Sequence, residues 1–126
     1  MSWQPDTAYL RVHQPSNPAL GQCYPTSRVV QLFFPSFEIA SGQVKVGSSL
    51  EAHFWNIDPT KTPIRHVDLT WQQFSRGAEI ISFEMLDRDK LNDSPPTVQR
   101  CELLLQRVLS RLGIADATRG RFKTAR

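Results

Sequence analysis

The chain has few cysteines, no long apolar run and no leader-like N-terminus, and each absence excludes a class of protein. Its 126 residues include only Cys23 and Cys101, too few for a disulfide framework and not spaced as a Cys-x-x-Cys metal or redox pair. The longest apolar runs span a few residues, which is too short to cross a bilayer. The first residues lack a basic region followed by an apolar one, so we expect no secretory signal, no membrane partner and a cytoplasmic location with free thiols.

The formal charge of +3 is concentrated at the C-terminus. Residues 119–126 contain Arg119, Arg121, Lys123 and Arg126 and no acidic residue; without them 11 basic and 12 acidic residues remain, a net charge of −1. We therefore expect a single domain over residues 1–118 and a disordered basic tail over 119–126. Nucleic-acid binding would have to depend on this tail alone, so it is not the favoured function.

Apolar periodicity predicts a helix, then short strands, then a second helix. Pro25 suits the first turn of a helix over 23–34, and Pro35 ends it. The predicted strands cover 37–40, 43–46, 50–57, 64–70 and 79–85, with a short turn or helix over 71–74. A last amphipathic helix over 96–112 places Cys101 on its apolar side, where we expect it in the core. This order predicts an α+β fold: a helix that begins with cysteine packs on an antiparallel sheet, and an amphipathic helix follows.

The predicted hairpin of strands 50–57 and 64–70 brings an imidazole and a carboxylate together. If the loop over 58–63 is symmetrical, the residue numbers of each pair add up to 121, so His53 lies directly opposite Asp68. A carboxylate there accepts the imidazole N–H, fixes the tautomer and stabilises the imidazolium. Trp55 and His66 form the next pair on this side. The opposite side is predicted to face the core and carries Ala52, Phe54, Val67 and Leu69.

Cys23 is predicted at the N-terminus of the first helix, where a thiol becomes a nucleophile most readily. Unpaired N–H groups at a helix N-terminus and a neighbouring imidazolium both stabilise a thiolate. The predicted chemistry has Cys23 as nucleophile, His53 as base and then acid, and Asp68 as the group that orients His53. The backbone N–H of Cys23 is a candidate oxyanion donor. The other candidates for oxyanion or substrate binding are Gln22, Trp55 and Asn56.

Four strings of residues, in this order, resemble the YunG-like family of small, uncharacterised bacterial proteins. They are Asn17-Pro18-Ala19-Leu20-Gly21-Gln22-Cys23, Val29-Val30-Gln31, His53-Phe54-Trp55-Asn56, and Asp68-Leu69-Thr70 with Gln73-Phe74. The resemblance covers roughly residues 2 to 112 and implies no established activity. A broader likeness is to papain-like and transglutaminase-like folds, in which a Cys opens a helix, a His lies on a following strand and an Asp or Asn lies on the next one.

Several functions remain open on the sequence alone. The first is a papain-like cysteine hydrolase or acyl transferase that acts on an amide, isopeptide, ester or thioester bond of a small-molecule or peptide substrate. The second is a non-catalytic binding or structural domain in which Cys23, His53 and Asp68 form a hydrogen-bonded network. A zinc site would have to use these three residues, with His66 as a fourth, without the paired spacing that zinc ligands usually have. We therefore expect no metal and no cofactor.

Overall fold

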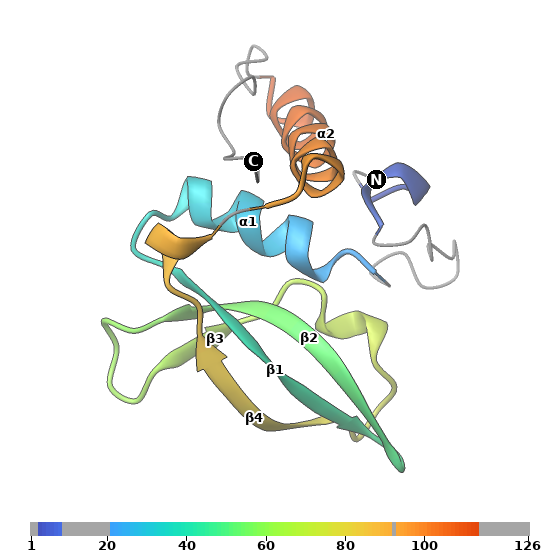
Figure 1. Cartoon of the computed structure of the whole chain (residues 1–126), viewed down its shortest axis with the longest axis vertical. Coiled ribbons are helices and arrows are strands. Elements are labelled where there is room, and N and C mark those ends of the chain that lie inside the picture. Colours follow the sequence, from blue (N-terminus) through green and yellow to red (C-terminus); the bar gives the residue numbers. More distant parts are fainter. Residues whose placement is uncertain (1–2, 9–20, 92, 114–126) are drawn as a thin grey trace.

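The structure is a computed structural model that describes residues 3–8, 21–91 and 93–113. These ranges contain an antiparallel sheet with the strand order β3-β2-β1-β4 and the helices α1 and α2. In Figure 1, α1 lies between the sheet and α2, which gives a layered α+β arrangement and confirms the predicted fold class. The elements are η1 (Pro5–Thr7), α1 (Cys23–Phe33), β1 (Glu38–Val46), β2 (Ser49–Asp58), β3 (Arg65–Val67), η3 (Trp71–Gln73), β4 (Glu79–Met85), η4 (Arg88–Lys90) and α2 (Pro95–Arg111).

The two helices share one apolar core. Val29 of α1 packs against a stripe of α2 whose buried residues are Val98, Cys101, Leu104, Leu105 and Leu109. The side chain of Ser94 caps α2 by accepting the N–H of Thr97, and Pro95 occupies the first turn, where its missing N–H costs nothing. Cys101 is completely buried in this core, as predicted, and burial raises the pKa of its thiol to about 12. No helix in the described ranges is long and apolar enough to cross a bilayer.

The sheet curls around a second core centred on Trp55. Trp55 packs with Ala40 and Ile57 on the concave side, and its ring also meets Phe83 of β4, with the ring centroids 5.7 Å apart. The curl brings β3 and β4, the two outer strands, together through His66 and Phe83, whose centroids are 5.1 Å apart. Gly42 makes this possible: a Cβ there would lie 2.6 Å from Cη2 of Trp55 and would collide with the carbonyl oxygen of Ser82.

The register predicted for the β2–β3 hairpin is wrong by two residues. Asn56 pairs with Val67 and Ile57 with His66, so paired numbers add up to 123 and His53 is not directly opposite Asp68. The reason is that β2 continues to Asp58, whose carboxylate accepts the N–H and hydroxyl of Thr60 and starts the loop one residue later. A shift of two residues keeps every side chain on its side of the sheet.

The predicted core side of this hairpin is only partly right: Phe54 and Val67 are half-buried, and Phe54 packs on Tyr24 of α1. Leu69 is 53% exposed and Ala52 is exposed, whereas His53 and Trp55 on the other side are each 1% exposed. The curl explains the difference, because it encloses the side that carries His53 and Trp55. The predicted strands 37–40 and 43–46 are likewise one strand, β1, which runs through Gly42 without a break.

Candidate active site

Cys23 is the first residue of α1, as predicted. Gly21 has a positive φ of 75°, which glycine adopts without strain, and turns the chain into the helix. The N–H groups of the first helical turn, including those of Cys23 and Tyr24, have no intrahelical carbonyl, so they point towards the space where an anionic group would bind. Cys23 is a free thiol with partial exposure. Its carbonyl accepts the hydroxyl of Ser27 at 2.7 Å. Cys23 is thus fixed at the end of a helix and remains partly exposed.

His53 is almost completely buried beside this helix end. Its Nε2 lies 2.7 Å from Oδ2 of Asp68, and the ring is 1% exposed. The ring lies nearly parallel to that of Trp55, with the ring centroids 5.6 Å apart. It packs edge to face with Phe74, with the ring centroids 4.7 Å apart. Trp71 packs on the imidazole from another side, with the ring centroids 6.2 Å apart. Three aromatic rings therefore fix the orientation of the imidazole.

Asp68 is held in place by the residue two positions later. Its Oδ1 accepts both the backbone N–H and the hydroxyl of Thr70, each at 3.1 Å, which leaves Oδ2 for His53. Thr70 itself is buried. Asp68 lies just beyond the end of β3 and reaches His53 diagonally across the hairpin, so the predicted contact forms although the predicted register does not.

The thiol of Cys23 and the carboxylate of Asp68 act on the same imidazole. Burial alone would lower the pKa of His53, but hydrogen bonding to Asp68, the proximity of the Cys23 thiol and the negative charges of both groups raise it to about 9. The second ring nitrogen, Nδ1, is buried, and no atom of the described residues meets it in hydrogen-bonding geometry. Since Nε2 is occupied by Asp68, Nδ1 is the ring atom free to exchange a proton with a group at Cys23.

The other three predicted site residues lie close to this cluster in different roles. Gln22 is completely buried; its Oε1 accepts the hydroxyl of Thr7 at 2.7 Å and its Nε2 donates to the carbonyl of Gln4 at 3.1 Å. Asn56 is buried and donates to the carbonyl of Ser27 at 3.0 Å, which ties β2 to α1.

Trp55 stacks on His53 and donates its indole N–H to Nδ1 of His66 at 3.0 Å. The described lining of the cavity at Cys23 includes neither Trp55 nor Asn56. Trp55 therefore supports the imidazole from behind, and Asn56 holds the helix that carries the thiol.

A cavity of about 620 Å³ opens beside Cys23. Its described lining combines the first turn of α1, the middle of β2 and the beginning of α2. The lining residues are Gly21, Cys23, Tyr24, Pro25, Glu51, Ala52, Phe54, Gln73, Asp93, Thr97 and Arg100. A ligand in this cavity would therefore lie next to the thiol.

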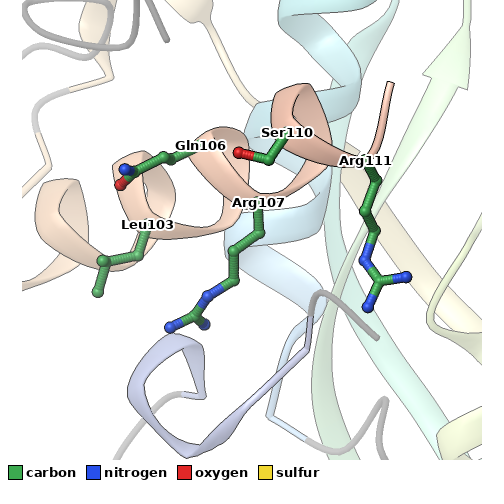
Figure 2. A pocket seen from close by; sticks show the side chains of 5 residues that line it. All are labelled: Leu103, Gln106, Arg107, Ser110 and Arg111. Carbon is green, nitrogen blue, oxygen red and sulfur yellow. The ribbon is translucent and has the colours of Figure 1, made fainter. Parts of the chain in front are cut away.

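A second hollow, of about 530 Å³, lies on the outer surface of α2 (Figure 2). Arg107 points from this surface towards η1, where its guanidinium pairs with both carboxylate oxygens of Asp6. The other side chains in Figure 2 are Leu103, Gln106, Ser110 and Arg111. The described lining of this hollow contains no thiol, imidazole or carboxylate. In the described ranges, the surroundings of Cys23 included, no three His, Cys, Asp or Glu side chains are grouped so as to hold a metal ion.

Three contributors to the site were missed by the sequence reasoning: Thr70, Phe74 and Trp71, whose ring packs on His53. Thr70 orients Asp68, and the Asp-x-Thr spacing of residues 68 and 70 is a recognisable signal, because an Asp side chain often accepts the N–H two residues later. Phe74 packs on the edge of His53 but carries no signal beyond its aromatic character, since its contact depends on how the segment after β3 folds back.

Comparison with known proteins gives one family. The model of the YunG protein family matches residues 1–113. This chain belongs to the YunG family. The match includes every described residue, and therefore Cys23, His53 and Asp68. It ends before residues 119–126, the predicted basic tail, which lies outside the described residues. No curated protein and no solved structure matches this YunG-family chain.

Proposed function

We propose that this YunG-family protein is a cysteine-dependent hydrolase or acyl transferase that acts on the carbonyl group of an amide, isopeptide, ester or thioester. The observation that carries the proposal is the environment of His53. A buried imidazole whose Nε2 is bound by Asp68, and whose Nδ1 meets no hydrogen-bond partner among the described residues, stands beside the partly exposed Cys23 at a helix N-terminus. Such a group is poised to move a proton to and from a nucleophilic sulfur.

In the first half of the reaction, the thiolate of Cys23 forms a bond to the carbonyl carbon and the carbonyl π electrons move to oxygen. The intermediate then collapses: the electron pair on oxygen restores the carbonyl, the bond to the leaving group breaks, and the leaving amine or alcohol takes the proton from His53. A thioester on Cys23 remains.

In the second half, water or an acceptor amine gives a proton to His53 as it attacks the thioester, and the sulfur leaves as thiolate. Water gives hydrolysis, and an amine gives acyl transfer. Asp68 keeps the imidazole oriented and stabilises its protonated form throughout, which agrees with the pKa of His53 being raised to about 9.

The oxyanion is proposed to form at the N-terminus of α1. The N–H of Cys23 is the first donor, because a group at this position has no intrahelical partner. Gln22 is the second candidate, since its amide carries two hydrogens and, among the described residues, Gln4 accepts one of them. Loss of one oxyanion donor typically costs about 3 kcal/mol of transition-state stabilisation.

The order of the elements also supports the proposal. A Cys opens a helix, a His lies on a later strand, and an Asp follows the next strand, as in the papain-like and transglutaminase-like folds that the chain resembles. The likeness is one of order and element type.

The proposal is tested by alkylation of Cys23 with iodoacetamide as a function of pH, followed by mass spectrometry. We expect rapid modification of Cys23 below pH 7 and loss of this rapid phase in His53→Ala. The matched control is Arg65→Ala, which removes an exposed side chain from the adjacent strand β3 and should leave the rapid phase intact. Buried Cys101 is the internal control for unfolding. A rate profile like that of an ordinary thiol, with a midpoint near about 8.5, would refute the proposal and favour a structural network.

Catalysis itself is tested with small amide, ester and thioester substrates, with and without an acceptor amine. We expect release of the leaving group by the wild-type protein, loss of turnover in Cys23→Ala, and retention in Cys101→Ala if that variant folds. Formation of the amine adduct separates transfer from hydrolysis. Equal turnover in the wild type and Cys23→Ala would contradict the assignment of the nucleophile.

A further inference from the structure

The cavity beside Cys23 has an apolar wall made by two elements that face each other. Tyr24 and Pro25 come from the first turn of α1, and Ala52 and Phe54 come from β2. The rings of Tyr24 and Phe54 meet edge to face, with centroids 4.9 Å apart and planes at 72°. Edge-to-face pairs are a favourable arrangement of aromatic rings, so this wall is rigid before any ligand arrives.

Tyr24 is held in that position from its polar end. Its hydroxyl donates to Oδ1 of Asp93 at 2.5 Å, and Nε of Arg28 donates to Oδ2 of the same carboxylate at 2.9 Å. Desolvation and the contact with Asp93 raise the pKa of Tyr24, so the ring stays neutral at physiological pH. The negative charge of Asp93 is thereby matched by Arg28.

The charged groups in the described lining do not favour an anionic ligand. Glu51 and Asp93 are acidic, and Arg100 is basic, with one of its N–H groups donated to Thr97 at 2.8 Å. Since Arg28 pairs with Asp93, Glu51 and Arg100 are left as one acidic and one basic group of the described lining, and a carboxylate or phosphate would meet about as much repulsion as attraction. A neutral group has no such penalty.

We propose that this cavity binds a neutral, apolar group of the substrate, aliphatic or aromatic, attached close to the carbonyl that Cys23 attacks. The assignment of this group to a substrate rests on the function proposed above, but binding of an apolar group beside the thiol does not. The volume of about 620 Å³ lies in the range of small-ligand pockets, roughly 300–1,000 Å³. The wall of Tyr24, Pro25, Ala52 and Phe54 supplies the apolar contacts.

The experiment compares three reagents that alkylate Cys23 by the same displacement of iodide: iodoacetamide, N-hexyl-iodoacetamide, and an iodoacetamide whose N-alkyl chain ends in a carboxylate. Each rate at Cys23 is divided by the rate of the same reagent with glutathione. Burial of one methylene group is worth up to about fourfold. We therefore expect the normalised rate of the hexyl reagent to exceed that of iodoacetamide by at least about tenfold, and the carboxylate reagent to lose this gain.

Two variants locate the effect. Ala52→Trp places a large ring in the cavity and should reduce the ratio of hexyl to parent reagent to about one. Lys45→Trp is the matched control: it adds the same ring at an exposed position of β1, outside the lining of the cavity, and should leave the ratio unchanged.

The ratio separates the two proposals. If Cys23 reacts slowly with every reagent but the hexyl reagent still reacts much faster than iodoacetamide, the proposed catalytic function is contradicted and the apolar site is supported. Rapid reaction with a ratio near one would keep the thiol chemistry and overturn the apolar site. A faster reaction of the carboxylate reagent would also overturn it, in favour of an anionic ligand. A hexyl ratio that persists in Ala52→Trp would overturn the assignment to this cavity.

Discussion

The sharpest consequence of the site concerns the protonation of His53. Its pKa is raised from the ordinary value of 6.5 to about 9, which corresponds to about 3 kcal/mol in favour of the imidazolium. Burial opposes this shift, so the shift depends on the two polar neighbours, Asp68 and Cys23. An opposite charge at the observed distance of 2.7 Å usually accounts for about 1–3 pKa units.

The perturbation is Asp68→Asn, which keeps the shape of the side chain and removes its charge. We expect the titration midpoint of His53 to fall by about 1–3 pH units, because burial, which favours the neutral ring, is then less opposed. NMR titration of the three histidine rings measures the midpoint directly, and His66→Gln assigns one of the other signals.

Asp58→Asn is the matched control for this experiment. Asp58 also accepts the N–H and hydroxyl of a threonine two residues later, but it does not contact His53. Its replacement should leave the midpoint in place. A wild-type midpoint near 6.5, or an equal shift in Asp58→Asn, would refute the reasoning about the carboxylate.

Two further predictions concern stability. Because the folded pKa of His53 is raised, its stabilising contribution is complete below pH 6.5 and is lost as the pH rises through about 9. In this window the free energy of unfolding, measured with urea, should fall by up to about 1.4 kcal/mol per pH unit. His53→Gln should remove this slope unless another group produces it. Gly42→Ala should destabilise the protein by about 1–3 kcal/mol, since the added Cβ would meet Trp55 and the backbone of Ser82. The control is Ser49→Ala, at an exposed end of β2, because Gly47 has a positive φ that alanine would not adopt without strain. Equal unfolding midpoints of Gly42→Ala and Ser49→Ala would contradict the packing argument.

The elements with strong local signals were predictable from the sequence. Pro25 and Pro35 mark the ends of α1, and the strand predicted over 79–85 coincides with β4. The apolar stripe of α2 placed Cys101 in the core. In each case the signal lies within a few residues of the element, so it does not depend on the rest of the fold.

The features that depend on distant segments were not predictable. The hairpin register follows from where Asp58 ends β2, and the predicted contact of His53 with Asp68 survived because a two-residue shift preserves the side of the sheet. The curl around Trp55 buried the side of β2 that was expected to face solvent, and it requires the missing side chain at Gly42, which lies on another strand. The cavity at Cys23 likewise has walls from segments separated by up to about 80 positions in the chain, as from Gly21 to Arg100.

The buried amide of Gln22 has a practical consequence for how the protein is handled. It joins Gln4 and Thr7 to the residue immediately before the thiol, across sequence separations of 18 and 15 residues. A shortened form that begins after Thr7 would remove both of these partners of the amide, and each lost hydrogen bond would cost about 1–3 kcal/mol of stability next to Cys23. Recombinant versions should therefore retain the first residues, and a cleavable fusion partner is better attached at the other end of the chain.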